Sequence, residues 1–226
     1  MRFPNGLKGV SKVFTAEILT LISSVVLVIS GIAALVAAAS AVGADGIADG
    51  AVATIGITGI LVVITSILLV IALILKLVGL SQAGKEEPNF KTAFIISIFV
   101  LILAVVSSIL SSTLAQDSAV DDIIALVQRI GDIVVIFLVI GGIQNFAVEL
   151  NNENMMNKGT SVAWIIAIPY ILGAIARLVM GLFGANAATA SIAGILGIVA
   201  GILSAIGSIL YLVYLGKGKK MLKEEA

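Results

Sequence analysis

Three ionisable residues inside long apolar stretches are the strongest candidates for chemistry in this sequence. Arg129 and Asp132 lie three positions apart in one stretch, and Arg177 lies in the next. A charged side chain taken out of water needs a partner of opposite charge or hydrogen bonds, because its desolvation is expensive. These residues could therefore pair with one another or bind a charged solute.

Depth and side-chain direction favour an ion pair between Asp132 and Arg177. In two antiparallel helices, both residues lie about 6–9 positions from the same end, which is a depth of about 9–14 Å. Side chains tilt toward the N-terminus of their helix. The side chain of Arg177 therefore points toward the middle of its helix, and that of Arg129 points toward the shared end. The competing pair is Arg129 with Asp132, at a spacing of three residues. Two roles stay open: fixing the register of the helices, or lining a solute or ion pathway.

Two amides extend this candidate polar site along the same stretch. Gln144 and Asn145 lie toward its far end, beyond Asp132. In the next stretch, Pro169 and Gly173 weaken the regularity of a helix at mid-length. If the protein contains a cavity, we expect it between these two helices.

The composition excludes most catalytic and metal chemistry. The 226 residues include no histidine and no cysteine. Disulfides, thiol nucleophiles, Cys/His zinc sites, histidine-ligated haem and triads that need histidine are therefore excluded. Thirteen basic residues balance thirteen acidic ones, so bulk charge gives no attraction for nucleic acid. We expect no enzyme activity, no cofactor, no metal ion and no nucleic-acid partner.

The elements that position these residues are predicted to be transmembrane helices. Sixty per cent of the residues are hydrophobic and 12% are charged, whereas about 25% are charged in soluble domains. A spanning helix needs about 20 apolar residues, and backbone in lipid must satisfy its own hydrogen bonds. The sequence predicts one all-α domain, an integral membrane bundle over residues 1–226. Its six helices are expected at residues 17–42, 52–80, 92–115, 123–149, 161–183 and 190–215.

Basic residues predict the orientation of the chain in the membrane. Eleven of the thirteen lie before the first helix, near the second and fourth links, or after the last helix, and the other three links contain none. Because basic residues stay on the cytoplasmic side, we predict cytoplasmic termini in a multi-pass protein of the cell membrane. A cleaved signal peptide ending at Ala37-Ala38-Ala39 is the alternative for the N-terminus, although residues 18–36 exceed its usual apolar length.

Aromatic residues near the predicted cytoplasmic helix ends indicate a belt at the level of the lipid head groups. They are Phe14, Phe90, Phe94, Trp164, Tyr211 and Tyr214.

Two patterns concern how the helices pack. Residues 15–21, 92–98 and 162–168 resemble one another at the starts of the odd-numbered helices. Three repeated helical hairpins would produce this pattern, and chance similarity among apolar helix starts is the alternative. In the sixth helix, small residues recur every four positions and predict a face that packs against another helix, in the same chain, a second copy or another membrane subunit. They are Ala193, Gly197, Gly201 and Ala205.

These features favour a transport or channel-type protein for a small solute, or the membrane subunit of a transport complex. The pathway would lie in the region of Arg129, Asp132, Gln144, Asn145 and Arg177. The alternative is a non-enzymatic membrane scaffold that binds partners through the small-residue face of the sixth helix.

Overall fold

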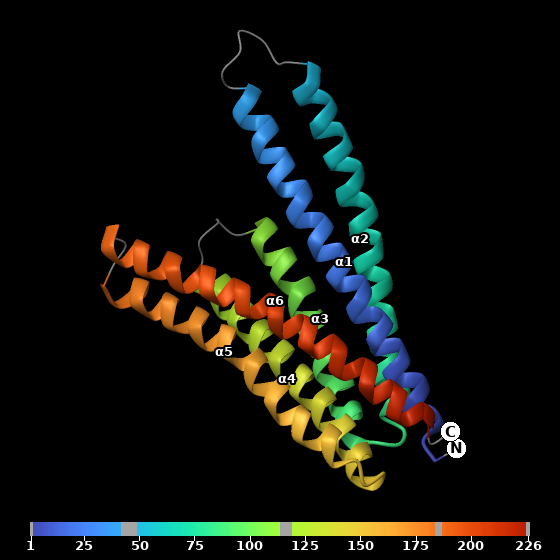
Figure 1. The fold of residues 1–226 in the computed structure, drawn as a ribbon. Helices are drawn as coiled ribbons and strands as arrows, with labels where there is room; N and C mark the ends of the chain where they lie inside the picture. The colour runs from blue at the N-terminus through green and yellow to red at the C-terminus, as the bar shows by residue number, and fades with distance from the viewer. Residues whose placement is uncertain (1, 42–48, 114–118, 184–186, 225–226) are drawn as a thin grey trace. The chain divides into compact units, whose positions relative to one another are not determined.

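The computed structural model describes residues 2–41, 49–113, 119–183 and 187–224. It describes side-chain surroundings over residues 2–37, 56–109, 123–173, 175, 191–192 and 194–224. The described chain forms six helices and no strand (Figure 1). The helices are α1 (Pro4–Ala41), α2 (Asp49–Ala83), α3 (Pro88–Thr113), α4 (Ala119–Glu149), α5 (Glu153–Phe183) and α6 (Ala187–Glu224). The predicted all-α fold with six helices is confirmed.

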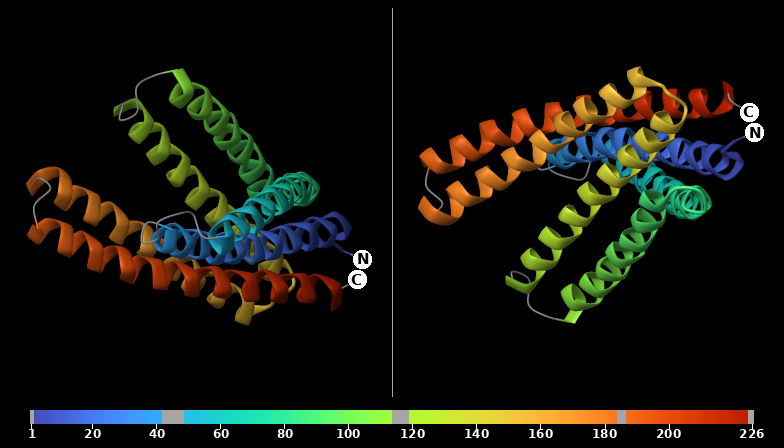
Figure 2. Two further views of the ribbon diagram at one scale, coloured as in Figure 1. Left: turned by 90° about the horizontal axis from the view of Figure 1, so that it is seen from above. Right: turned by 90° about the horizontal axis from the view of Figure 1, so that it is seen from below.

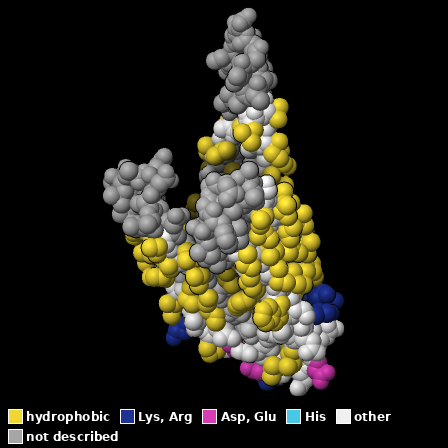
Figure 3. Space-filling model, turned by 90° about the vertical axis from the view of Figure 1, so that its left-hand side faces the viewer, with side chains coloured by type: hydrophobic (Ala, Val, Ile, Leu, Met, Phe, Trp, Pro, Cys, Tyr) yellow, Lys and Arg dark blue, Asp and Glu magenta, His cyan; other side chains and the backbone are white. Residues whose placement is uncertain are grey.

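Within the residues whose side-chain surroundings are described, five helical segments are long and apolar enough to span a membrane: Pro4–Ala37, Gly56–Ala83, Pro88–Ile109, Ile123–Glu149 and Gly194–Glu224. The apolar part of α5 continues into residues whose side-chain surroundings are not described. Many large apolar side chains are exposed, Leu35 at 73%. Hydrophobic side chains cover most of the described surface in Figure 3, and charged ones gather at its lower end. Such a surface suits acyl chains and not water, so the protein is a multi-pass membrane protein in contact with lipid.

Three helices extend beyond the predicted apolar crossings. Helix α1 begins at Pro4, α5 begins at Glu153 and α6 ends at Glu224, each at least eight residues outside the predicted range. Local signals allow these extensions. Proline suits the first position of a helix, where its missing N–H costs no hydrogen bond. Asn152 caps α5, because its Oδ1 accepts a hydrogen bond of 3.1 Å from the N–H of Met155.

The described helices belong to two compact units. Unit 1 comprises Met1–Ser11 and Gly79–Ala226, and unit 2 comprises Lys12–Val78. Helices α1 and α2 each run without interruption through a boundary between the units. The prediction of a single transmembrane domain therefore stays a prediction.

Unit 2 is a helical hairpin with a narrow seam of small residues. Buried positions lie seven residues apart, at Ala16, Ser23, Ser30 and Ala37 in α1 and at Thr65 and Ala72 in α2. A seven-residue spacing keeps one face of each helix toward its neighbour, and small side chains permit a close approach. An ion pair of 2.8 Å joins Glu17 of α1 to Lys76 of α2.

Unit 1 has its packed core at one end. Figure 2 shows the α3–α4 and α5–α6 hairpins close together at the turn between α4 and α5, and diverging away from it. The fully buried side chains around the end of α4 are Phe90, Ile140, Ile143, Phe146, Tyr214 and Leu215. Glycines bring neighbouring helices close here, since a Cβ on Gly142 would lie 2.5 Å from the ring of Phe90.

The aromatic belt prediction is wrong for three residues. Phe90, Tyr211 and Tyr214 are at most 3% exposed, so their rings contact protein and not head groups. Trp164 is 65% exposed, as a belt residue should be. A position near a helix end does not show whether an aromatic ring lies in the protein interior or among the lipid head groups, because both environments favour aromatic side chains.

Candidate functional site

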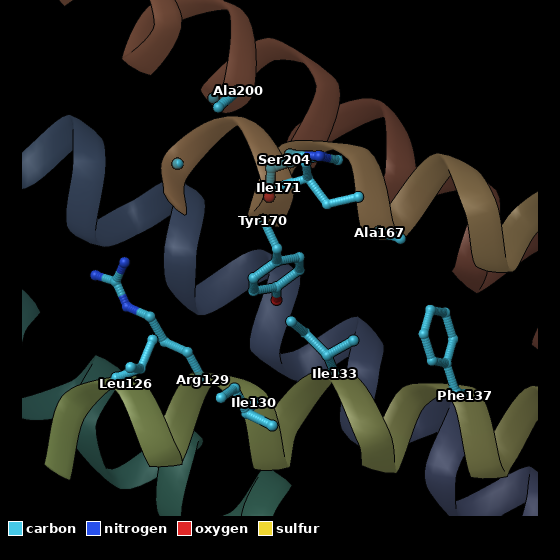
Figure 4. Close-up of a pocket in the computed structure, with 13 residues that line it drawn as sticks. Leu126, Arg129, Ile130, Ile133, Phe137, Ala167, Tyr170, Ile171, Ala200 and Ser204 are labelled. Atoms are coloured by element: carbon cyan, nitrogen blue, oxygen red, sulfur yellow. The ribbon is translucent and has the colours of Figure 1, made fainter. Parts of the chain in front are cut away.

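A cavity of about 700 Å³ lies between α4, α5 and α6 in unit 1 (Figure 4). Its volume falls within the range of about 300–1,000 Å³ that is common for small-molecule sites. The cavity lies where the α3–α4 hairpin diverges from the α5–α6 hairpin, so the packed core of unit 1 does not fill it.

One face of α4 forms the first wall of the cavity. It contributes Leu126, Arg129, Ile130, Ile133 and Phe137. These residues recur every three or four positions, which places them on the same side of a helix. In Figure 4, Arg129 lies near the Leu126 end of this wall and Phe137 lies at the other end.

Helices α5 and α6 form the opposite wall. Tyr170 projects from α5 toward α4 in Figure 4, and Pro169 precedes it in the sequence. Helix α6 contributes Ala200, Gly201 and Ser204. These small side chains leave open space opposite the isoleucines of α4, which is why the cavity exists at this level.

The polar groups of the cavity are few and differ in kind. Arg129 is the one charged side chain in the described lining, and Tyr170 and Ser204 contribute hydroxyl groups. A guanidinium group stays protonated in proteins and only donates hydrogen bonds. The arrangement therefore suits a ligand that is mostly apolar and that carries a hydrogen-bond acceptor or an anionic group.

The predicted pair of Asp132 and Arg177 cannot be placed as a pair. Asp132 has an exposed side chain on α4 and does not line the cavity. The side chain of Arg177 lies outside the described residues, so this pair stays a prediction. The ion pairs found between described residues do not include one between Arg129 and Asp132.

Gln144 and Asn145 lie at the packed end of unit 1, about 22 Å along α4 from Arg129. The Nε2 of Gln144 donates to the carbonyl of Met156, at 2.7 Å, and to the hydroxyl of Thr160, at 3.2 Å. The Nδ2 of Asn145 donates to a carboxylate oxygen of Glu87, at 2.8 Å. Both amides thus connect α4 to neighbouring segments, and the structure does not bring them together with Arg129.

Sequence reasoning missed a carboxylate that binds the start of α1. Glu86 accepts hydrogen bonds from the backbone N–H of Asn5, at 3.0 Å, and of Gly6, at 2.6 Å. It also accepts one from the side-chain amide of Asn5, at 3.0 Å. The first N–H groups of a helix lack partners within the helix and favour a negative charge. The signal was the acidic pair Glu86-Glu87 directly before Pro88.

Sequence reasoning also missed Tyr170 and Ser204. Tyr170 is the one tyrosine of three that lies far from the predicted cytoplasmic ends, and this position could have marked it as a cavity residue. Ser204 lies three residues after Gly201 and so shares its face of α6.

The small-residue face of α6 is open where the structure describes it. A Cβ added to Gly197 or Gly201 would find no atom within 4 Å, and Ala205 is exposed. The side chain of Ala193 lies outside the described residues. Gly201 lines the cavity. Packing of this face against a second copy or another subunit stays a prediction.

No family model matches the chain, and the comparisons with curated proteins and with solved structures find no similar protein.

Proposed function

We propose that this membrane protein transports a small, largely apolar solute and that the solute binds in the cavity between α4, α5 and α6. The observation that carries the proposal is the cavity itself, about 700 Å³ in volume, with Arg129 in an otherwise mostly aliphatic wall. A charged residue at membrane depth is costly and commonly belongs to a solute pathway. The same site would serve whether the chain works alone or as the membrane subunit of a transport complex.

The chemistry of the lining supports binding and passage rather than catalysis. A hydrolase site needs a nucleophile and a base that activates it. Ser204 and Tyr170 supply hydroxyl groups, but Arg129 keeps its proton and cannot act as the base. We therefore propose a transporter or channel-type protein without enzyme activity.

The distribution of basic residues supports an orientation with both termini in the cytoplasm. Under this orientation α4 runs inward, and Arg129 lies in the outer half of the cell membrane. The positively charged group then lies within reach of the outer head-group region, since arginine side chains extend toward water where they can.

The experiment compares two glycine substitutions on α6. Gly201→Phe places a ring in the cavity, whereas Gly197→Phe places the same ring one helical turn away, outside the lining. Both positions have open space for a side chain, so both variants should fold. Purified variants are reconstituted into liposomes, and release of a panel of lipophilic anions, cations and neutral solutes is measured.

Transport through the cavity predicts that Gly201→Phe reduces release to the protein-free rate and that Gly197→Phe retains it. If neither the wild type nor any variant accelerates release of any solute, the proposal is wrong. Helicity measured by circular dichroism confirms that each reconstituted variant is folded.

The second candidate function is a membrane scaffold. The observation that favours it is the open space beside Gly197 and Gly201 on the small-residue face. Since both glycines belong to that face, a scaffold predicts that both phenylalanine variants lose association with a second copy or another subunit. Cross-linking in membranes would detect that loss.

A further inference from the structure

We infer that the solute is a single-chain anionic amphiphile, bound with its acidic group at Arg129 and its hydrocarbon chain along α4 toward Phe137. This inference rests on the proposed function, because it names the solute class of the same cavity.

The charge of Arg129 argues for an acidic head group. None of the ion pairs between described residues involves Arg129. A guanidinium group among aliphatic side chains binds most strongly to a carboxylate or phosphate, which accepts hydrogen bonds from two of its N–H groups. The Arg129 side chain is exposed and so is accessible to a ligand; a neutral solute would offer its charge no partner, and a cationic solute would be repelled.

The apolar wall argues for a hydrocarbon chain. From Arg129 the lining continues through Ile130 and Ile133 to Phe137, a distance of about 12 Å along the helix. Each methylene buried against such a wall strengthens binding by about fourfold. A short polar anion would gain nothing from this wall, so a medium or long chain is favoured.

The form of the site argues for one chain rather than two. The described lining contains one cation and one continuous apolar run along α4, and its volume is about 700 Å³, within the range for small ligands. The opposite wall is interrupted by the hydroxyl groups of Tyr170 and Ser204, so it offers the second chain of a diacyl phospholipid a poorer surface than α4 does. We therefore assign the site to a single-chain carboxylate or similar anion.

The exposure of the lining indicates entry from the bilayer. Leu126, Ile130 and Ile171 line the cavity and are still 49%, 51% and 50% exposed. In a membrane these exposed surfaces contact acyl chains. An amphiphile dissolved in the bilayer reaches the cavity sideways, with its head group already at the level of the lipid head groups.

The experiment measures binding of dodecanoate to the full chain in nanodiscs of phosphatidylcholine, with dodecanol, hexanoate and phosphatidylglycerol as comparison probes. The variants are Arg129→Gln, Arg129→Lys and the control Lys158→Gln, which removes an exposed cation outside the lining. We expect saturable dodecanoate binding, weakened about tenfold or more by Arg129→Gln. Arg129→Lys should retain most of the affinity, and Lys158→Gln should retain all of it.

Two results would overturn the inference. One is dodecanoate binding of equal strength to the wild type and to a folded Arg129→Gln variant. The other is saturable, Arg129-dependent binding of phosphatidylglycerol in preference to dodecanoate. Dodecanoate that binds through Arg129 but is never released across the liposome membrane would uphold the inference and contradict the transport proposal.

Discussion

Two neighbouring carboxylates contact the ends of three helices in unit 1. Glu86 accepts hydrogen bonds from the first residues of α1. Glu87 is 6% exposed, and it accepts hydrogen bonds from the backbone of Asn89 at the start of α3 and from Asn145 of α4. Charge-assisted hydrogen bonds are stronger than neutral ones, so this acidic pair stabilises the packed end of the unit.

Replacement of Glu86 by glutamine should destabilise the protein. The amide loses the negative charge and one of the two accepting oxygens at the start of α1, which should cost about 1–2 kcal/mol. The free energy of unfolding in mixed micelles, measured by circular dichroism, checks this value. The control is Glu224→Gln, an exposed carboxylate at the end of α6, which should change that free energy by less than about 0.5 kcal/mol. Equal stability of the two variants would contradict the role given to Glu86.

At the level of single residues, the sequence predicted only part of the candidate site. It singled out Arg129, because a charge in an apolar stretch is visible without a structure. It placed Gln144 and Asn145 in the same site, but these amides bond to Met156, Thr160 and Glu87 at the other end of the helix. A side-chain amide can serve either role, and the choice depends on neighbours from distant parts of the chain.

Among the elements, the α1–α2 hairpin is stabilised by close packing rather than by side-chain hydrogen bonds at its centre. Ser23 and Ser30 are at most 3% exposed, and their hydroxyl oxygens have no hydrogen-bond partner among the described residues. Their value to the hairpin is their small size, which lets two helices approach closely.

Substitutions at Ser30 should distinguish the effect of side-chain size on stability from the effect of the hydroxyl group. Ser30→Ala keeps the small size and removes a hydroxyl without a partner, so stability should stay the same or rise by up to about 1 kcal/mol. Ser30→Leu should cost about 1–3 kcal/mol, because it forces the helices apart. Thermal unfolding of both variants in detergent measures the difference. A leucine variant as stable as the wild type would show that α1 and α2 do not pack at this position.

The helices themselves were well predicted, but the start of α1, the start of α5 and the end of α6 were not. Apolar length identified the stretches that cross lipid, which is the strongest constraint on a membrane protein. The extension of α1 back to Pro4 and of α6 on to Glu224 depends on packing at the terminal end of unit 1. There Leu215 and Leu222 are at most 3% exposed. Hydropathy alone does not report such packing, because these turns also contain lysines.

For the molecule as a whole, the orientation in the membrane is the prediction with the widest consequences. The native chain contains no cysteine, so single cysteines can be labelled without background. With an impermeant thiol reagent on intact cells, Asp45→Cys should react and Lys223→Cys should react only after lysis. The reverse pattern would place the termini outside and would move Arg129 to the inner half of the membrane.

The unequal packing of unit 1 makes the surrounding lipid part of the site. Its two hairpins are bonded to each other near the turn between α4 and α5 and diverge beyond it, so acyl chains can contact the cavity lining on its open side. The gap between α4 and α5 should then widen or narrow with the order and thickness of the acyl layer pressing on it. The affinity of the cavity for dodecanoate should therefore differ between thin, fluid bilayers and thick, ordered ones, even though the protein and the ligand are the same.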